Sequence, residues 1–375
     1  MLAAPPLIPL IHRDLRLSQS AVGVLTALPP LMFALIAMPG SALIARLGPV
    51  RTLVAGLFLT AAASAFRGAD GVALLYGATV VMAAGIAVMN LALPSIVRDW
   101  MPDRVGFGTA VYSNGLLIGE LLAVWLTVPF ILPLLAGRWG FALAAWAIPV
   151  FITFLLFAAR VREDGGPEGS APRFGWRPSW KDPLVWRLGF IFGAAAAIYL
   201  VANFFLPDYL HHTHRPELVV KSLAALNLCQ LPASLLLLAL ADKLSRLRSP
   251  YVVCGLLLIA ALAGIVFGPG QWVVAASGLL GFLTASLLVL TFSLPPALAR
   301  REEVHLLSAG MFTVSYACSV AIPIACGFLW DMTGRPVSMF LLPGIAALAI
   351  AVLALGLRVS DKQAGLDGRP GDFRT

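Results

Sequence analysis

The sequence predicts an all-α membrane protein with two bundles of six helices, and three observations lead to this fold class. The first is composition: 60% of the 375 residues are hydrophobic and 12% are charged, and the mean hydropathy is +0.91. Because soluble domains carry roughly 25% charged residues, most of this surface is expected to face lipid. The other two observations are a series of membrane-length apolar segments and an internal repeat.

Apolar segments of roughly 17–25 residues are long enough to cross a bilayer as helices. We mark eleven of them, joined mostly by short connections. They cover residues 20–45, 50–67, 71–97, 105–135, 138–160, 185–210, 219–241, 250–268, 271–299, 304–330 and 336–358. Eleven spans are one short of two six-helix bundles.

The first residues, MLAAPPLIPLIHRDLRLS, supply half of the missing span. Pro5, Pro6 and Pro9 disfavour an isolated helix, and the basic flank of a signal peptide is absent. We therefore interpret this run as the last half of a first helix that is truncated at the N-terminus. An apolar in-frame extension of the DNA upstream of Met1 would restore a full span.

The chain is expected to divide into four parts. Residues 1–161 form an N-terminal helical bundle and residues 185–358 a C-terminal one. Residues 162–184 are rich in Gly, Pro and charge, which is typical of a linker. Residues 359–375 are polar and are expected to be a disordered tail.

The basic residues indicate the orientation. When the spans are threaded in order, 19 of the 26 Lys and Arg residues fall on one side of the membrane. By the positive-inside rule, this side is the cytoplasm, so the linker and the C-terminus are expected there, in a bacterial inner membrane. The same distribution explains the isoelectric point near 9.7 without a nucleic-acid partner.

The two halves of the chain repeat each other at an offset of about 200 residues. LALPSIVRDW (91–100) matches FSLPPALARRE (292–302), with Pro94 and Pro295 in equivalent places. LIARLGPVR (43–51) and ALADKLSRLR (239–248) form a second pair. Parallel repeats joined by a cytoplasmic linker are the plan of a large class of secondary transporters.

These features resemble the major facilitator superfamily, whose signature Gly-x-x-x-Asp-Arg/Lys-x-Gly-x-Arg/Lys follows the second span. The first copy departs from the signature at Ser41 and Ala45, and the second copy departs at Ser245. The retained residues are Arg46, Gly48 and Arg51 in the first copy and Asp242 and Lys243 in the second. The resemblance implies that these five residues help to lock one conformational state.

Within the superfamily the chain is most similar to the cyanate and nitroimidazole transporter family. The stretches PLIPLIHRDLRLSQSAVGVLTALPPL, GIAVMNLALPSIVRDW and NFFLPDYLHH carry this likeness. It implies a major facilitator fold, no enzymatic activity and a monomer that moves a small solute by alternating access, as a symporter if protons are coupled. The alternative is a transporter-like membrane sensor or a truncated homologue that does not transport.

Glu120 is the one charged residue that the predicted spans place mid-helix. A charge at the bilayer centre costs roughly 2.5–3.5 kcal/mol on insertion scales, so Glu120 is expected to face the interior. Thr109, Ser113 and Thr127 are spaced to share its helix face. Glu120 is therefore predicted to couple protons or bind solute. The alternative, a protonated Glu that only joins helices, stays open.

Neutral polar residues in other spans are expected to line the same cavity. Each of them taken alone is more typical of helix–helix contact. The candidates are Asn90, Ser113, Asn114, Tyr199, Asn203, Asn227, Gln230, Thr284 and Tyr316.

No cofactor or metal is predicted. The string HHTH (211–214) could bind metal, but its place at a helix end favours a solvated loop. Nothing resembles a phosphate-binding P-loop, and no nucleophile–base arrangement is visible. Because the Lys and Arg residues of the spans lie only near their ends and none lies in the interior, a neutral, cationic or proton-accompanied solute is expected.

Overall fold

A computed structural model describes residues 7–15, 19–69, 71–163 and 178–357 of the chain. Within these ranges the structured elements are all helices, and the predicted all-α class is confirmed. The predicted tail and most of the predicted linker lie outside the described residues. The four domain boundaries therefore stay predictions.

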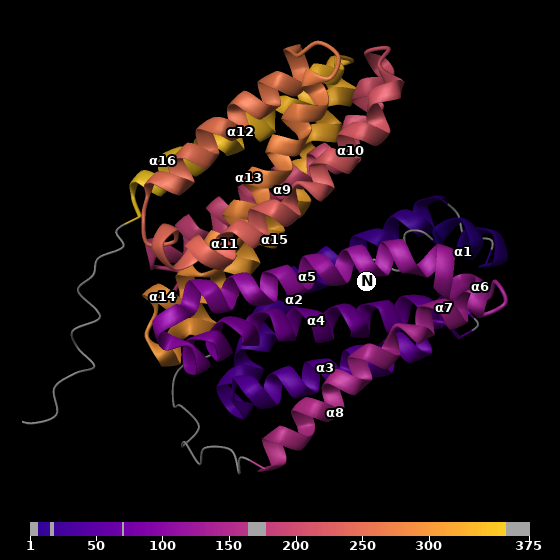
Figure 1. The fold of residues 1–375 in the computed structure, drawn as a ribbon, viewed down its shortest axis with the longest axis vertical. Coiled ribbons are helices and arrows are strands. Elements are labelled where there is room, and N and C mark those ends of the chain that lie inside the picture. The colour runs from indigo at the N-terminus through magenta and orange to yellow at the C-terminus, as the bar shows by residue number, and fades with distance from the viewer. Residues whose placement is uncertain (1–6, 16–18, 70, 164–177, 358–375) are drawn as a thin grey trace, which may run out of the picture.

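The N-terminal half forms one group of helices and the C-terminal half another (Figure 1). The first group contains α1 (Ile8–Leu15), α2 (Gln19–Leu47), α3 (Pro49–Phe66), α4 (Val72–Trp100), η2 (Pro102–Arg104), α5 (Val105–Leu126), η3 (Thr127–Ile131), α6 (Leu132–Leu134), α7 (Trp139–Ala145) and α8 (Ala147–Glu163). The second contains α9 (Pro183–His212), η4 (Pro216–Leu218), α10 (Val219–Leu228), α11 (Gln230–Leu244), α12 (Ser249–Phe267), α13 (Trp272–Phe292), α14 (Leu294–Leu298), η5 (Arg301–Glu303), α15 (Val304–Thr333), η6 (Pro336–Phe340) and α16 (Leu341–Leu355).

Ten helical segments of the described chain are long and apolar enough to cross a membrane. An eleventh crossing is formed if α5 and the segment after it are taken together, across a bend of 43°. The expected straight span 105–135 is thus broken. Pro129 and Pro133 lie in or just after the π-helical segment η3, where proline removes backbone donors and disturbs helical geometry.

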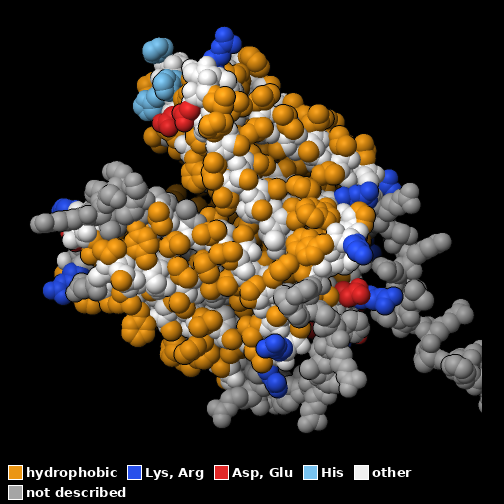
Figure 2. All heavy atoms as spheres, turned by 180° about the vertical axis from the view of Figure 1, so that it is seen from behind, with side chains coloured by type: hydrophobic (Ala, Val, Ile, Leu, Met, Phe, Trp, Pro, Cys, Tyr) orange, Lys and Arg blue, Asp and Glu red, His pale blue; other side chains and the backbone are white. Residues whose placement is uncertain are grey.

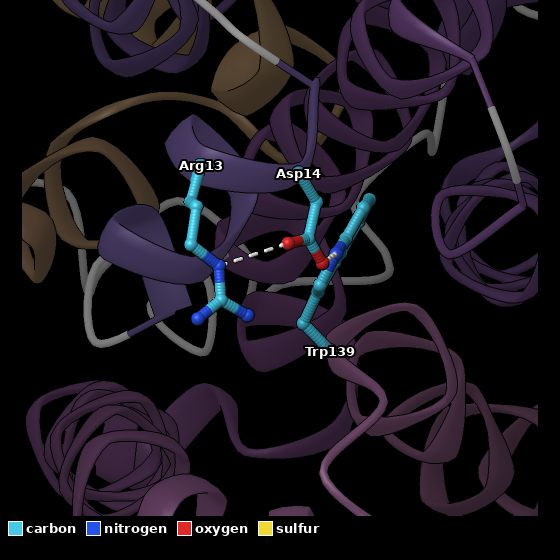
Figure 3. Close-up of polar contacts among 3 residues, drawn as sticks. All are labelled: Arg13, Asp14 and Trp139. Atoms are coloured by element: carbon cyan, nitrogen blue, oxygen red, sulfur yellow. Dashed lines mark hydrogen bonds and ion pairs between the residues drawn. The ribbon is translucent and has the colours of Figure 1, made fainter.

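The short helix α1 has 8 residues among those described. Leu7 and Ile11 are fully or almost fully buried in a small core cluster that also contains Trp139 of α7. The carboxylate of Asp14 accepts a hydrogen bond of 2.9 Å from the Trp139 indole Nε1 and contacts Arg13 at 3.2 Å (Figure 3). These contacts fix α1 against the N-terminal bundle.

The two bundles meet at one end and separate toward the other (Figure 1). Most of the contact between them comes from two crossings, α2 with α15 and α5 with α11. We call the end where α14 lies against α4 the closed end, and the end where α1 and α10 lie the open end. The space-filling view shows a notch between the two bundles toward the open end (Figure 2).

On the face that Figure 2 shows, hydrophobic side chains cover the sides of both bundles, whereas Lys and Arg gather toward the ends. Phe267, for example, is 82% exposed, which in water would be costly for a residue of that size. This distribution fits a protein whose solvent is lipid over most of its length.

The sequence repeat also has a structural counterpart at the closed end. Asp99 in the first repeat segment forms an ion pair with Arg301 in the second, with 2.6 Å between Oδ1 and Nε. The equivalent ends of the two halves therefore face each other across the bundle interface.

Candidate functional site

Glu120 lies on the face of α5 that points toward the C-terminal bundle. The residues Gly106, Ser113 and Glu120 are seven positions apart, so they share one helix face. At the closed end the backbone N–H of Gly106 donates a 2.6 Å hydrogen bond to Oδ1 of Asp242 on α11. Glu120 is fourteen residues further on, about 21 Å along the helix. The bundles separate toward this end of α5 (Figure 1), and the Glu120 side chain is exposed.

The carboxylate of Glu120 has no hydrogen-bond or ion-pair partner among the described residues. Tyr199 of α9 and Tyr316 of α15 belong to the opposite bundle. The direction set by Gly106 and the exposure of Glu120 point the carboxylate toward the space between the bundles, which we call the cleft.

The wall opposite Glu120 is a hydrogen-bonded network of neutral side chains. The hydroxyl of Tyr199 donates to Oδ1 of Asn227 at 2.7 Å. The Nδ2 of Asn227 donates to Oδ1 of Asn203 at 3.1 Å and to the Leu223 carbonyl at 2.9 Å. Gln230 adds a long contact of 3.5 Å to Asn227 Oδ1. Four of the predicted cavity residues are therefore brought together on α9, α10 and α11.

A cluster of aromatic side chains also connects the two bundles. Phe33 of α2 stacks on Tyr316 of α15 with ring centroids 4.8 Å apart and planes at 20°. Phe192 and Phe312 contact the same tyrosine ring at 6.2 and 5.9 Å. Tyr112 of α5 joins the cluster through Phe292 at 6.3 Å. Separating the bundles at this level requires the Phe33–Tyr316 stack to open.

The remaining predicted cavity residues lie elsewhere or bond locally. Asn114 donates from Nδ2 to the Ser234 carbonyl of α11 at 3.0 Å, so it joins the two bundles. The hydroxyl of Thr284 donates to carbonyls of its own helix. Asn90 is half-buried, and the buried Ser113 hydroxyl lacks a partner in the described part of the chain.

The sequence predicts that Thr109, Ser113 and Thr127 share the helix face of Glu120, and this prediction is wrong for Thr127. Its hydroxyl donates to the Ala123 carbonyl and accepts a 2.9 Å hydrogen bond from Trp146 Nε1 in the same bundle. The bend at η3 turns this residue into the N-terminal bundle. Thr109 is fully buried. Of the four residues predicted to share this helix face, only Glu120 is therefore exposed to the cleft.

The two copies of the signature differ in their contacts. Asp242 of the second copy accepts hydrogen bonds from the backbone N–H groups of Gly106 and Phe107, at 2.6 and 3.3 Å. These are orphan donors at the N-terminus of α5, where a negative charge is favourable. In the first copy Ala45 replaces the carboxylate, and Arg46 is exposed.

The other signature residues lie at the same end. Arg51 and Lys243 are exposed. Gly48 has φ of 80°, a conformation that side chains rarely adopt. It makes the turn between α2 and α3 and accepts a 2.7 Å hydrogen bond from Thr52. These residues shape the closed end without a described bond between the bundles.

Sequence reasoning missed the aromatic cluster and a buried cation. The cluster brings together residues up to 283 positions apart, and only the pair Phe312 and Tyr316, one turn apart, gave a local signal. Arg67, the last residue of the predicted span 50–67, is only 5% exposed. It sits at the C-terminus of α3, where a cation is favourable. Burial lowers the pKa of Arg67 to about 10, so it stays charged at neutral pH.

The histidine string lies at the C-terminal end of α9. The ring of His212 packs on Trp330 at 5.3 Å. Across the described ranges, no group of three or more His, Cys, Asp or Glu side chains could hold a metal ion.

Comparison with known proteins identifies the family. Residues 1–323 match the family model described as Major Facilitator Superfamily. The chain belongs to this superfamily, which confirms the resemblance seen in the sequence. The family is one of transporters, and the chain is accordingly a transporter-type integral membrane protein and no enzyme.

Several relatives have similarity over most of their length. The chain is 26% identical over 357 residues to the 2-nitroimidazole transporter of Escherichia coli (strain K12), covering 94% of this chain and 90% of that protein. It is 24% identical to the cyanate transport protein of the same organism, covering 93% and 91%. An uncharacterized transporter of Bacillus subtilis (strain 168) is 24% identical over 332 residues, covering 88% and 82%.

Solved structures support the fold. A bacterial homologue of the iron transporter ferroportin, in an outward-facing state, has a TM-score of 0.75 at 14% identity, with 95% of each chain covered. The E. coli fucose:proton symporter has a TM-score of 0.70 at 16% identity, again with 95% of each chain covered. At these identities the likeness concerns the fold alone.

Proposed function

We propose that this protein is a secondary active transporter that carries a small solute across the bacterial plasma membrane by alternating access, and that Glu120 couples this transport to protons. One observation carries the proposal. An ionisable side chain lies in the cleft between two bundles, without a partner among the described residues, and faces a wall of neutral hydrogen-bonding groups.

The distribution of basic residues supports an orientation. The side that holds 19 of the 26 Lys and Arg residues contains the closed end. If this side is cytoplasmic, the cleft opens outward and the C-terminus lies in the cytoplasm. A single copy contains both walls of the cleft, so a monomer suffices for the cycle.

The chemistry of coupling follows from the cost of a buried charge. A carboxylate within a membrane costs roughly 2.5–3.5 kcal/mol or more, and Glu120 has no protein cation beside it in the described structure. A proton or a bound solute must then balance it whenever the cleft closes. A group that binds a proton on one side and releases it on the other is a proton coupler.

The relatives suggest probes for solute binding. One is a transporter of 2-nitroimidazole and another of cyanate, and both compounds are small. We propose a solute of similar size for this protein. The neutral network of Tyr199, Asn203 and Asn227 would recognise its polar groups.

Uptake into proteoliposomes tests the proposal. The full chain is reconstituted, a pH gradient is imposed, and accumulation of radiolabelled 2-nitroimidazole and cyanate is measured. The wild type should accumulate a probe faster with the gradient than without it. Glu120→Gln should lose this response, whereas Glu217→Gln, the same change at an exposed residue outside the cleft, should keep it. Unchanged gradient dependence in Glu120→Gln would refute proton coupling through this residue.

A further inference from the structure

The cleft contains an acidic side chain with no cation beside it among the described residues. Glu120 has no ion-pair partner in the described structure, where the two ion pairs lie at the ends of the bundles, at Asp14 and Asp99. The basic side chains described for α5, α9 and α15 lie at or near the ends of these helices, as Arg104 and Arg187 do. A solute that brings its own positive charge would balance the carboxylate.

The opposite wall has already used most of its hydrogen-bond donors. Both N–H groups of the Asn227 amide are bonded, to Leu223 and Asn203. The Tyr199 hydroxyl donates to Asn227, and the Asn203 amide donates to the Tyr199 carbonyl at 3.0 Å. A wall whose donors are occupied suits a solute that donates rather than one that accepts.

Aromatic rings also lie on the cleft wall opposite Glu120. Tyr199 and Tyr316 lie on the bundle opposite Glu120, and ring faces attract cations. In the Phe33–Tyr316 stack, with planes only 20° apart, each ring covers one face of the other, so the outer faces are the flat surfaces left for a solute. Flat aromatic surfaces favour a flat solute, because stacking maximises contact.

We infer that the cleft selects a planar organic cation, such as a protonated amidine or nitrogen heterocycle. Glu120 binds the charged N–H groups, and Tyr199 and Tyr316 contact the ring or the charge. The inference rests on the proposed function, because it places the solute beside Glu120. It goes further by naming the charge and shape of that solute.

Equilibrium binding to three matched probes tests this selectivity. Benzamidine is a planar cation at neutral pH, benzamide is its neutral counterpart, and benzoate is an anion of the same size. Binding of each is measured by calorimetry to the full chain in lipid nanodiscs. The variants are Glu120→Gln, Glu120→Asp and Tyr316→Leu, with Glu217→Gln as the control and thermal unfolding as the check on folding.

The wild type should bind benzamidine about tenfold more tightly than benzamide, a factor that corresponds to a partly desolvated cation site. Benzoate should bind most weakly. Glu120→Gln should erase the preference and Glu120→Asp should retain it. Tyr316→Leu should weaken both benzamidine and benzamide severalfold.

Three results would overturn the inference: benzoate binding as tightly as benzamidine, a preference that survives in Glu120→Gln, or no binding of any probe. Because the assay measures binding without transport, its outcome is separate from the proteoliposome test. A chain that binds benzamidine selectively but ignores a pH gradient would refute proton coupling and leave the cation selectivity standing.

Discussion

The two walls of the cleft come from equivalent halves of the chain but carry different chemistry. The N-terminal wall presents Glu120, an ionisable group without a described partner. The C-terminal wall presents Tyr199, Asn203 and Asn227, which are neutral and bonded to one another. Neutral groups that satisfy each other form a fixed surface, whereas a lone carboxylate must be balanced by something that arrives and leaves.

A second carboxylate sharpens this contrast. Asp242 of the C-terminal bundle accepts two hydrogen bonds from backbone N–H groups of α5 at the closed end. Its charge is therefore stabilised by groups of the protein itself. Glu120 has no such partner in the described chain. We therefore expect substitutions at Asp242 to change the balance between conformations, and substitutions at Glu120 to change what is transported and coupled.

The largest effect is expected when the charge is moved from one wall to the other. Glu120→Gln should lower gradient-driven uptake at least tenfold, since each tenfold loss corresponds to about 1.4 kcal/mol. Adding Asn227→Asp in the same chain places a carboxylate opposite the original site and should restore part of the gradient response. Uptake by the single and double variants in proteoliposomes measures this. A double variant no better than Glu120→Gln would show that position matters as well as charge.

Disrupting the neutral wall should have the next largest effect. Asn227→Ala removes hydrogen bonds to Tyr199 and Asn203 and leaves their polar groups unpaired, which costs about 1–3 kcal/mol. The thermal unfolding midpoint and the affinity for solute should both fall, while uptake should still respond to a pH gradient. If the gradient response disappears too, the division of roles between the walls is wrong.

Removing the charge of Asp242 should change how often the closed end opens. Asp242→Asn weakens the capping of α5 by about 1 kcal/mol, which changes the ratio of closed to open populations severalfold. Spin labels on the exposed positions Arg51 and Arg246 measure the distance between the two bundles at this end. The four native cysteines, Cys229, Cys254, Cys318 and Cys326, are first replaced.

Asp99→Asn is the matched control for Asp242. It breaks the ion pair with Arg301, whose side chain is 73% exposed, and an exposed pair contributes only about 0–1 kcal/mol. The distance distribution should therefore change less than in Asp242→Asn. The opposite order would make the ion pair the main contact of the closed end.

The smallest effect is expected from Tyr199→Phe, which keeps the ring and removes one hydroxyl. The lost hydrogen bond to Asn227 contributes about 0.5–1.5 kcal/mol, so solute affinity should fall severalfold at most. Cation preference should persist, because the charge of Glu120 and the ring face remain. Competition binding with benzamidine and benzamide measures both quantities.

The fold could be predicted from the sequence because each span is decided locally. Long apolar segments leave a helix as the only way to satisfy the backbone in lipid, and the repeat fixes the grouping into halves. Glu120 could be singled out for the same reason, since one charge in an apolar segment is visible without any structure. Its role in coupling or binding stays a prediction.

Other parts of the site depend on contacts between distant segments. The stacking of Phe33 on Tyr316 joins two helices that no local pattern connects. The position of Thr127 depends on the bend at η3, which rotates the helix face by an amount that spacing alone does not give. The role of Asp242 as a cap for α5 likewise required the crossing of α5 and α11.

The central claim is that Glu120 is the group that exchanges a proton for a cationic solute, and infrared difference spectroscopy observes that carboxyl directly. Spectra of the full chain in nanodiscs are recorded with and without benzamidine, for the wild type and for Glu120→Gln. If Glu120 exchanges a proton for the cation, benzamidine removes a protonated carboxyl C=O band in the wild type, and no such change occurs in Glu120→Gln. A band change that persists in Glu120→Gln, or no carboxyl change in the wild type, would contradict it.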